Sequence, residues 1–416
     1  MIDIIDKTKC CGCTACSSIC PNQCIIMAKD EEGFDFPKVN ISECLGCNLC
    51  SSVCQYCNPM KNDNLTIAYA SKCHDDSIRM SSSSGGLFSI IAEAIICAGG
   101  IVCGAAFDQA FKEVKHIFVD SIEGLKALRA SKYVQSSMAN AFHDIRKTLE
   151  TGRLVLFTGT PCQVSGLKHY LGNSYDNLLC IDTVCHGVPS PRLWVEYINY
   201  LESKYKGKTV NVCFRKKKEG QPWGVHRKNN RTTVFREKNQ DPYMRMFLNN
   251  SSLRMSCYNC QAKKDNSYAD ITLGDFWGIK SIAPEFDDEK GITLLIVNTC
   301  KGKKMIDSIE KKCELLHVEY GKAAKGNPML YESASMPEDR EMFSKLLNKT
   351  SFIEIANTFT QKRRIAFRQI ISESLFGTAV KHIIGKEERK FQYGLLVEIR
   401  RQRLNEKQIV KQLSVY

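Results

Sequence analysis

The chain has 416 residues, 22 of them cysteines, and a formal net charge of +13 at pH 7. This length allows two or three domains, and the positive charge suits an acidic partner, but no nucleic-acid-binding motif accompanies it, so we expect no nucleic-acid function. The opening residues, MIDIIDKTKC, carry no apolar export segment, so we expect a cytoplasmic protein whose thiols stay reduced, which excludes a disulfide-linked fold.

The first feature along the chain is the run CCGCTACSSICP, which places five cysteines within eleven residues. A disulfide knot, a zinc site and an iron–sulfur cluster are the three candidates. Cys10, Cys13, Cys16 and Cys20 follow the C-x2-C-x2-C-x3-C-P spacing of bacterial ferredoxins, whereas zinc usually takes two separated pairs of ligands. The spacing therefore favours a 4Fe–4S cluster.

A second run, CLGCNLCSSVC, repeats this spacing about thirty residues later. In two-cluster ferredoxins the fourth cysteine of each run binds the other cluster. We therefore expect residues 1–60 to form a two-cluster module, with Gln55 where a proline is usual. The expected ligands are Cys10, Cys13, Cys16 and Cys54 for cluster one, and Cys44, Cys47, Cys50 and Cys20 for cluster two. Cys11, Cys24 and Cys57 are left over and are expected to be small buried core residues.

Residues 61–77 are polar and are predicted to be a linker, after which strands and helices alternate. The apolar stretch 88–107 contains Glu93 and a Gly-Gly pair, so we expect a helix, a turn and a strand there and not a membrane span. The alternation predicts an α/β domain with a mixed sheet. The predicted helices are 87–98, 122–130, 139–150 and 164–171, and the predicted strands are 101–107, 114–119, 153–157 and 178–184.

The second half of the chain continues with a predicted helix over 191–206 and a basic, strand-like middle over 210–237. Further predicted helices are 241–249 and 302–314, with strands over 269–276 and 291–299. The stretch 351–416 holds 13 Lys or Arg against 6 Glu and shows helical periodicity. For this tail we expect surface helices in preference to a membrane-surface segment. The expected fold class is α+β multidomain, with domains 1–60, 70–150 and 151–335 and a tail over 336–416.

Four more cysteines stand in distinctive places. Cys162 and Cys185 each follow a predicted strand, and Cys257 and Cys260 form a CxxC pair. Cofactors bind beyond the carboxyl ends of parallel strands, so these four thiols are candidates for a third cluster. The residues alone leave alternatives open, since a CxxC can be a redox pair or half a zinc site and a cysteine after a strand can belong to the core.

Two short segments have the character of anion sites. SSSSGG at 81–86 opens a predicted helix, and TGTP at 158–161 follows a predicted strand. Free backbone N–H groups at a helix N-terminus attract phosphate, although serine–glycine runs are often plain loops. Two such segments in one α/β domain indicate a dinucleotide pyrophosphate.

The ordered set SSSSGGLFS, SKYVQSS, LFTGTPCQVSGLKHYL, CHGVPSP, DPYMRMFL, CYNCQ and DITLGDFWGI resembles the beta-subunit family of coenzyme F420-reducing hydrogenases and dehydrogenases over roughly residues 70–330. The resemblance implies FAD beside a 4Fe–4S cluster. By this resemblance the flavin contacts are Ser84, Gly85, Gly86, Thr158, Gly159 and Thr160, with Lys132, Tyr133, Gln135 and Asp275 as further cofactor contacts. Phe276 and Trp277 line the pocket or belong to the core, and His186 donates protons or hydrogen-bonds a sulfur or carbonyl.

The sequence thus predicts an iron–sulfur flavoprotein oxidoreductase with two ferredoxin-type 4Fe–4S clusters, a third cluster and FAD. Three clusters and a flavin pyrophosphate would bring the charge down to roughly +5, so much of the basicity balances cofactors. The expected partners are an electron donor or acceptor protein and a small redox substrate. The alternatives are an electron-transfer adaptor without a substrate and a zinc-containing nucleic-acid binder.

Overall fold

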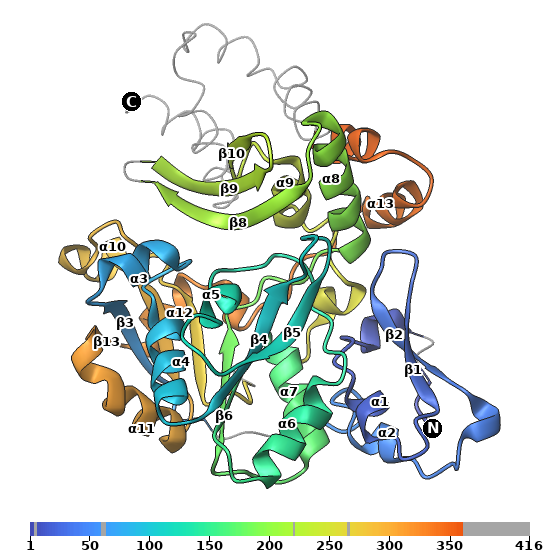
Figure 1. The fold of residues 1–416 in the computed structure, drawn as a ribbon, viewed down its shortest axis with the longest axis horizontal. Helices are drawn as coiled ribbons and strands as arrows, with labels where there is room; N and C mark the ends of the chain where they lie inside the picture. Colours follow the sequence, from blue (N-terminus) through green and yellow to red (C-terminus); the bar gives the residue numbers. More distant parts are fainter. Residues whose placement is uncertain (4–5, 60–63, 219–220, 264–266, 361–416) are drawn as a thin grey trace, which may run out of the picture. The chain divides into compact units, whose positions relative to one another are not determined.

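The computed structural model describes residues 1–3, 6–59, 64–218, 221–263 and 267–360 (Figure 1). The chain divides into two units, Met1–Asn357 and Thr358–Tyr416, and every element described below belongs to the first. Most of the predicted tail, 361–416, lies outside the described residues.

The N-terminal module is a hairpin flanked by short helical turns. Strand β1 (Ile25–Lys29) pairs antiparallel with β2 (Asp35–Val39). Two of the helical turns begin after a left-handed residue, Thr14 at φ 70° and Asn48 at φ 60°, which stand at equivalent positions of the two cysteine runs. The helical turns are η1 (Lys7–Lys9), α1 (Ala15–Ile19), η2 (Ile41–Glu43) and α2 (Leu49–Ser52).

The centre of the unit is an eight-stranded mixed sheet in the order β13-β3-β12-β11-β7-β6-β4-β5. Strands β11, β7, β6 and β4 run parallel, and the strands on either side of them pair antiparallel. The carboxyl ends of the parallel strands therefore meet at one edge of the sheet. The strands are β3 (Ile67–Cys73), β4 (Ile101–Phe107), β5 (Val114–Val119), β6 (Val155–Gly159), β7 (Leu178–Thr183), β11 (Ile271–Asp275), β12 (Thr293–Val297) and β13 (Cys313–Val318).

Helices cover both faces of this sheet. Helices α4 (Leu87–Cys97) and α11 (Cys300–Ile309) share one apolar core with one face. Helices α6 (Ala141–Glu150) and α7 (Pro161–Leu171) share a second core with the other face, and α1 of the N-terminal module packs against α7. The remaining elements around the sheet are α3 (Asp76–Ser81), α5 (Leu125–Leu128), α10 (Ile279–Ile282), η4 (Pro284–Phe286), η5 (Glu310–Lys312), α12 (Tyr320–Lys325) and η6 (Pro328–Leu330).

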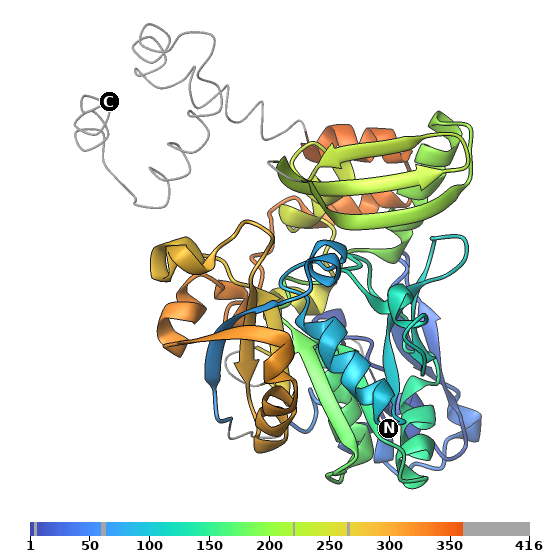
Figure 2. The ribbon, with the colours of Figure 1, turned by 60° about the vertical axis from the view of Figure 1, so that its left-hand side comes forward.

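A smaller antiparallel sheet follows the order β10-β9-β8 (Figure 2). Its aromatic core includes Trp194, Phe214 and Tyr243, whose rings lie 5.0 to 6.0 Å apart. The elements of this part are α8 (Pro191–Lys204), β8 (Thr209–Lys218), β9 (Gln221–Asn229), β10 (Thr233–Glu237), α9 (Pro242–Leu248), η3 (Met255–Asn259) and α13 (Arg340–Leu347).

The observed α+β multidomain architecture confirms the predicted fold class, and strands 101–107 and 114–119 are confirmed residue for residue. The linker prediction is wrong, because 67–73 form β3 inside the large sheet. The helix predicted over 122–130 shrinks to α5, and the helix predicted to 314 ends at Ile309 because Cys313 begins β13. Within the described residues, no helix is long and apolar enough to span a membrane.

Candidate functional site

A cavity of about 620 Å³ lies at the carboxyl ends of β6, β7 and β11. This volume lies in the range of cofactor and ligand pockets. Most of the predicted site residues line it: Ser84, Gly86, Lys132, Tyr133, Gln135, Thr158, Gly159, Thr160, Cys162, Cys185, His186, Asp275 and Trp277. Gly85 and Phe276 are not among the lining residues. The tertiary structure thus brings together segments that lie far apart in the sequence.

The 81–86 loop enters this cavity from the start of α4. Gly86 is the N-cap of the helix at φ 91°, in the left-handed region that favours glycine. Gly85 faces away and donates its backbone N–H to Thr293 Oγ1 at 2.8 Å. The Ser84 hydroxyl donates to the Ile292 carbonyl at 2.7 Å, so this side chain holds the loop against β12.

The TGTP segment joins β6 to α7. Thr160 caps the helix, and its backbone N–H donates to Gln163 Oε1 at 2.9 Å. Helix α7 therefore begins at Pro161, three residues earlier than the sequence predicts, and Cys162 lies in its first turn. The Thr160 hydroxyl lies 3.2 Å from the Cys162 sulfur, so the anion-type loop and the cysteine are in direct contact.

His116 of β5 lines the cavity although nothing in the sequence pattern singles it out. Its Nε2 lies 2.9 Å from the Thr158 carbonyl, and its buried Nδ1 has no hydrogen-bond partner among the described residues. Burial lowers the pKa of His116 to about 4, so the ring is neutral at pH 7. A neutral imidazole that donates through Nε2 has Nδ1 as an acceptor. From the sequence, the alternation of residues in the predicted strand 114–119 would place His116 in the apolar core.

Lys132 and Gln135 serve the loop structure of the cavity wall. Lys132 is buried and donates to the carbonyls of Leu128 at 2.9 Å, Arg129 at 2.8 Å and Ala130 at 3.2 Å. Burial lowers the pKa of Lys132 to about 7. The charged Lys132 ammonium therefore donates all three of its protons to backbone carbonyls. The side chain stabilises the turn that precedes the cavity wall. Gln135 Nε2 donates to the Cys11 carbonyl at 3.0 Å, which ties the wall to the N-terminal module.

Basic and aromatic side chains form another part of the lining. Arg215 makes an ion pair with Asp275 and stacks over Trp223 with 4.6 Å between its guanidinium carbon and the ring centroid. The Lys238 ammonium lies 4.9 Å from the Trp223 ring and 5.3 Å from the Trp277 ring. We call Arg215, Trp223, Lys238 and Trp277 the basic–aromatic rim. Of these four residues, the sequence singles out only Trp277. It marks the 210–237 segment as basic without distinguishing Arg215 or Trp223, and Lys238 lies just outside that segment.

His186 lies beside Cys185 in the cavity wall. Its Nε2 lies 2.7 Å from Asn250 Oδ1, and its ring meets Phe247 edge-on at 5.1 Å. Burial lowers the pKa of His186 below its usual value. The sequence suggests that His186 hydrogen-bonds either a sulfur or a carbonyl. In the structure its partner is the carbonyl oxygen of the Asn250 side-chain amide.

The four remaining predicted ligands, Cys162, Cys185, Cys257 and Cys260, meet next to the cavity. Burial raises the pKa of Cys257 to about 12 and that of Cys260 to about 11, and in both cases the Cys162 thiol adds to the increase. Burial, together with the thiols of Cys257, Cys162 and Cys260, also raises the pKa of Cys185. Each thiol thus lies within electrostatic range of the others, although they come from three separate segments of the chain.

The ferredoxin-type cysteines lie in two groups. Burial raises the pKa of Cys16, and the thiols of Cys13, Cys10 and Cys54 add to the increase. Cys20, Cys44, Cys47 and Cys50 line a separate small cavity of about 20 Å³. Of the leftover cysteines, Cys11 and Cys24 are buried, whereas Cys57 is exposed, so the prediction of a buried residue is wrong for Cys57.

The chemistry of these donor sets fits iron–sulfur clusters. Four thiols that face one another, most of them at least partly buried, cannot all ionise without a positive centre among them, and a cluster would supply one. Within the described residues, no group of three or more His, Cys, Asp or Glu side chains is arranged to hold a metal ion. A four-iron cluster spaces its thiolates more widely than a single metal ion does, so that finding bears mainly on single-ion sites such as zinc.

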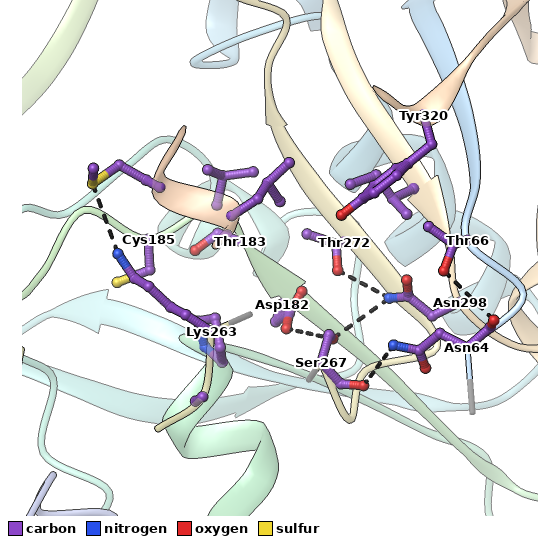
Figure 3. A pocket seen from close by; sticks show the side chains of 16 residues that line it. Asn64, Thr66, Asp182, Thr183, Cys185, Lys263, Ser267, Thr272, Asn298 and Tyr320 are labelled. Carbon is purple, nitrogen blue, oxygen red and sulfur yellow. Dashed lines mark hydrogen bonds between the residues drawn. The ribbon is translucent and has the colours of Figure 1, made fainter. Parts of the chain in front are cut away.

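A second, smaller polar cavity of about 40 Å³ lies beside the third cysteine set (Figure 3). Asp182 of β7 points into it, and its Oδ2 accepts a hydrogen bond from the Ser267 hydroxyl at 2.8 Å. Burial raises the pKa of Asp182 to about 7. Lys263 lines the same cavity and donates to the Glu332 carbonyl at 2.7 Å. Thr183, Val184 and Cys185 line both cavities, so the end of β7 separates them.

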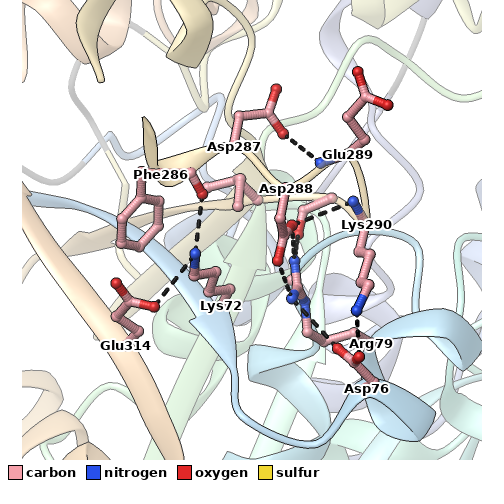
Figure 4. Close-up of polar contacts among 12 residues, drawn as sticks. Lys72, Asp76, Arg79, Phe286, Asp287, Asp288, Glu289, Lys290 and Glu314 are labelled. Carbon is pink, nitrogen blue, oxygen red and sulfur yellow. Dashed lines mark hydrogen bonds and ion pairs between the residues drawn. The ribbon is translucent and has the colours of Figure 1, made fainter. Parts of the chain in front are cut away.

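An ion-pair cluster fixes the loop behind the 81–86 segment (Figure 4). Arg79, which is 3% exposed, donates from Nη1 to Asp288 Oδ2 at 2.6 Å and from Nη2 to the Gly291 carbonyl at 3.2 Å. Lys217 donates to the carbonyls of Arg79, Ser84 and Lys290 at 2.6 to 2.7 Å. Lys217 of the basic middle segment thus stabilises these loops and is not among the residues that line the large cavity.

A comparison with protein families matches part of the region that builds this cavity. A model of the family that comprises the C terminus of the coenzyme F420 hydrogenase/dehydrogenase beta subunit matches residues 152–320. No curated protein matches the chain. Among solved structures, a chain of the F420-reducing NiFe hydrogenase complex from Methanosarcina barkeri is similar, with a TM-score of 0.44 and 13% identity over 74% of this chain and 95% of that chain. The matched residues 152–320 include Cys162, Cys185, Cys257 and Cys260, the four cysteines of the third set.

Proposed function

We propose that the protein is an iron–sulfur flavoprotein oxidoreductase. It would pass electrons between ferredoxin-type 4Fe–4S clusters and FAD, with two-electron (hydride) reduction or oxidation of coenzyme F420 or another conjugated organic substrate. The family match over residues 152–320 supports a redox function. The observation that carries the proposal is that Cys162 and Cys185 line the same 620 Å³ cavity as the 158–160 and 81–86 loops.

The chain's own residues would hold three clusters and one flavin. Cys10, Cys13, Cys16 and Cys54 would hold one cluster, Cys20, Cys44, Cys47 and Cys50 the second, and Cys162, Cys185, Cys257 and Cys260 the third. When bound, the clusters would supply one-electron transfer and the flavin two-electron chemistry. We assign residues 1–60 to the ferredoxin-type domain and 336–416 to the basic tail. The flavin region between them is better begun at Ile67 than at residue 70, because 70 lies inside β3.

Within the cavity, the loops at 158–160 and 84–86 would face the flavin phosphates. Both lie where a strand or loop meets the start of a helix, which suits an anionic group. His116 would present its free Nδ1 as a hydrogen-bond acceptor to the flavin or to its substrate. The basic–aromatic rim would receive the substrate, because indole faces suit a flat conjugated ring and the cations suit an acidic group.

The metal and flavin content of anaerobically purified protein tests this proposal. We expect about twelve irons and one FAD per chain, from three clusters of four. About eight irons with FAD would remove the third cluster from the proposal. About eight irons without FAD would favour an electron-transfer adaptor, and the isolated protein would then reduce no small molecule. A colourless zinc protein would contradict the proposal entirely.

A further inference from the structure

We infer that Gln55 and Cys11 form the electron-transfer contact between the Cys10/Cys13/Cys16/Cys54 site and the cysteine set beside the flavin cavity. This inference rests on the proposed function and adds the order in which electrons pass through the three cysteine sites. The Cys10/Cys13/Cys16/Cys54 site is the inner one of the module, and we call it the inner site. The Cys20/Cys44/Cys47/Cys50 site is the outer site, where electrons enter from or leave to a partner protein.

Gln55 joins the two sites directly. Its side chain is 5% exposed, and Nε2 donates to the Cys11 sulfur at 3.2 Å and to the Cys162 carbonyl at 2.9 Å. The second of these hydrogen bonds connects positions 107 residues apart in the chain. Gln55 follows Cys54 where the first run has Pro21. A proline there would offer no side-chain donor, so this departure from the usual ferredoxin pattern creates the contact.

Cys11 lies between ligands of the two sites. Cys11 is 6% exposed, its sulfur accepts a hydrogen bond from Gln55 Nε2 at 3.2 Å, and it also hydrogen-bonds to the thiols of Cys13 and Cys162. Its position breaks the x2-x2-x3 spacing, so it is not a cluster ligand. A thiol that bridges an inner-site ligand and a third-site ligand leaves no solvent gap between them. The contact therefore consists of packed, hydrogen-bonded protein atoms.

Helix α7 brings the two sites into this close contact at Gly166. A Cβ atom built at Gly166 would lie 2.6 Å from Cys13 Cβ and 2.8 Å from Cys13 Sγ. Real Cβ atoms do not approach other atoms this closely, so the position requires a residue without a side chain. The same helix carries Cys162 in its first turn. One helix thus packs on a ligand of the inner site and supplies a ligand of the third site.

The outer site has a different environment. Cys47 is exposed, whereas none of the inner-site cysteines is. Met1, Leu45 and Leu49 line the small cavity beside it and are 45%, 67% and 43% exposed. In the part of the chain that the structure describes, the hydrogen bonds of the 44–50 loop stay within the N-terminal module. The outer site is therefore the one that faces solvent.

The inference is tested by Gln55→Met, which keeps the length of the side chain but removes both hydrogen bonds. Asn58→Leu is the control, because it removes an amide hydrogen bond of 3.0 Å to the Ser52 carbonyl within the same module, and Asn58 lines neither the small cavity nor the large one. The probe is a reduced small ferredoxin, a one-electron donor too large for the cavity. Each flavin takes up two electrons, so two molecules of reduced ferredoxin are oxidised for each flavin reduced. Stopped-flow absorbance measures the rate of flavin reduction.

We expect Gln55→Met to keep the iron and FAD content of the wild type and to slow flavin reduction at least tenfold. Asn58→Leu should stay within twofold of the wild-type rate. Gly166→Ala is the second variant. Its added methyl group would push against Cys13 and should slow flavin reduction, while the absorption spectrum of the outer site should stay unchanged. A wild-type rate in either variant with full iron and FAD would overturn the inference and leave the proposed function intact. Wild-type protein without FAD or without the third cluster would instead overturn the proposed function.

Discussion

The guanidinium of Arg254 lies beside Cys10, with Nη2 3.6 Å from the sulfur and Nε donating to the Cys10 carbonyl at 2.8 Å. Arg254 is 1% exposed and also donates to Gln135 Oε1 at 3.1 Å and to the Asp35 carbonyl at 2.8 Å. A buried positive charge therefore lies at the inner site and contacts Gln135, which lines the 620 Å³ cavity. It comes from a position 244 residues later in the sequence than Cys10.

Replacing this charge should change the redox properties of the inner site. A nearby cation stabilises the more negative, reduced form of a cluster, so Arg254→Met should lower its midpoint potential, and Arg254→Lys should lower it less. Potentiometric titration monitored by electron paramagnetic resonance measures the shift. Lys38→Met, which removes an exposed charge from the same module, is the control. An unchanged potential in Arg254→Met would show that the guanidinium serves only the packing of the module.

Gly86→Val should lower the FAD content of the purified protein. A β-branched side chain would strain the backbone at φ 91° and crowd Cys73 and Ile78, each 3.2 Å from the added Cβ, so the 81–86 loop could no longer meet a pyrophosphate. Gly99→Val is the matched control, because Gly99 has φ 79° at the other end of α4 with open space around it. Flavin absorbance per chain measures the effect. Equal FAD in both variants would remove the loop from the flavin site.

Asp182 should make the stability of the protein pH-dependent. Burial raises its folded-state pKa to about 7 from an ordinary value of 3.8, so the folded state binds the extra proton and stability falls as pH rises from about 4 to about 7. The slope of the unfolding free energy should approach about 1.4 kcal/mol per pH unit between those two pKa values, the limit for one proton.

Asp182→Asn should remove this slope and be the more stable protein at pH 8. Unfolding midpoints of both proteins between pH 5 and pH 8 measure the difference, and Asp176→Asn at an exposed position is the control. If the difference in unfolding free energy between the wild type and Asp182→Asn stayed constant from pH 5 to pH 8, the raised pKa of Asp182 would be contradicted.

Cys20→Ser should damage the outer site, although Cys20 is nearer in sequence to the inner-site cysteines. Its side chain lines the small cavity with Cys44, Cys47 and Cys50, so loss of its thiolate removes a ligand from that site. We expect about four fewer irons per chain and an inner site with an unchanged spectrum. Cys57→Ser, at an exposed cysteine outside both groups, should keep all iron. Loss of the inner-site signal in Cys20→Ser would exclude the crossed arrangement.

Cys257→Ser should remove the third site and spare the ferredoxin-type module. Cys257 lies among Cys162, Cys185 and Cys260, and none of the module's own ligands depends on it. Iron should fall by about four per chain, dithionite should still bleach the module, and flavin reduction by a reduced ferredoxin should slow sharply. Iron counts and rapid-mixing spectra check these outcomes together. If Cys257→Ser kept all its iron and reduced the flavin at the wild-type rate, the CYNC segment would have a structural role and would not bind a cluster.

Local sequence was enough for elements whose pattern is self-contained. Strands 101–107 and 114–119 and helix α4 were predicted within one residue, because each is apolar, of ordinary length and bounded by turn residues. Strand β3 was missed because Ala68, Ala70 and Ser71 are small and polar lysine and asparagine residues surround them. Its partners β12 and β13 come from the last third of the chain, so nothing near it in sequence marks it as a central strand.

The sequence by itself determined the spacing of the eight ferredoxin-type cysteines, because ligands within one short loop meet wherever that loop folds. It also determined the order of motifs on which the resemblance to the F420 hydrogenase/dehydrogenase beta-subunit family rests. Only the tertiary structure decided that Cys162, Cys185 and the CYNC pair meet, that His116 and the basic–aromatic rim share their cavity, and that Gln55 and Cys11 join the inner site to it. Those contacts join residues from different strands and helices, and a side chain's neighbours across a sheet depend on packing and strand order, which no local pattern records.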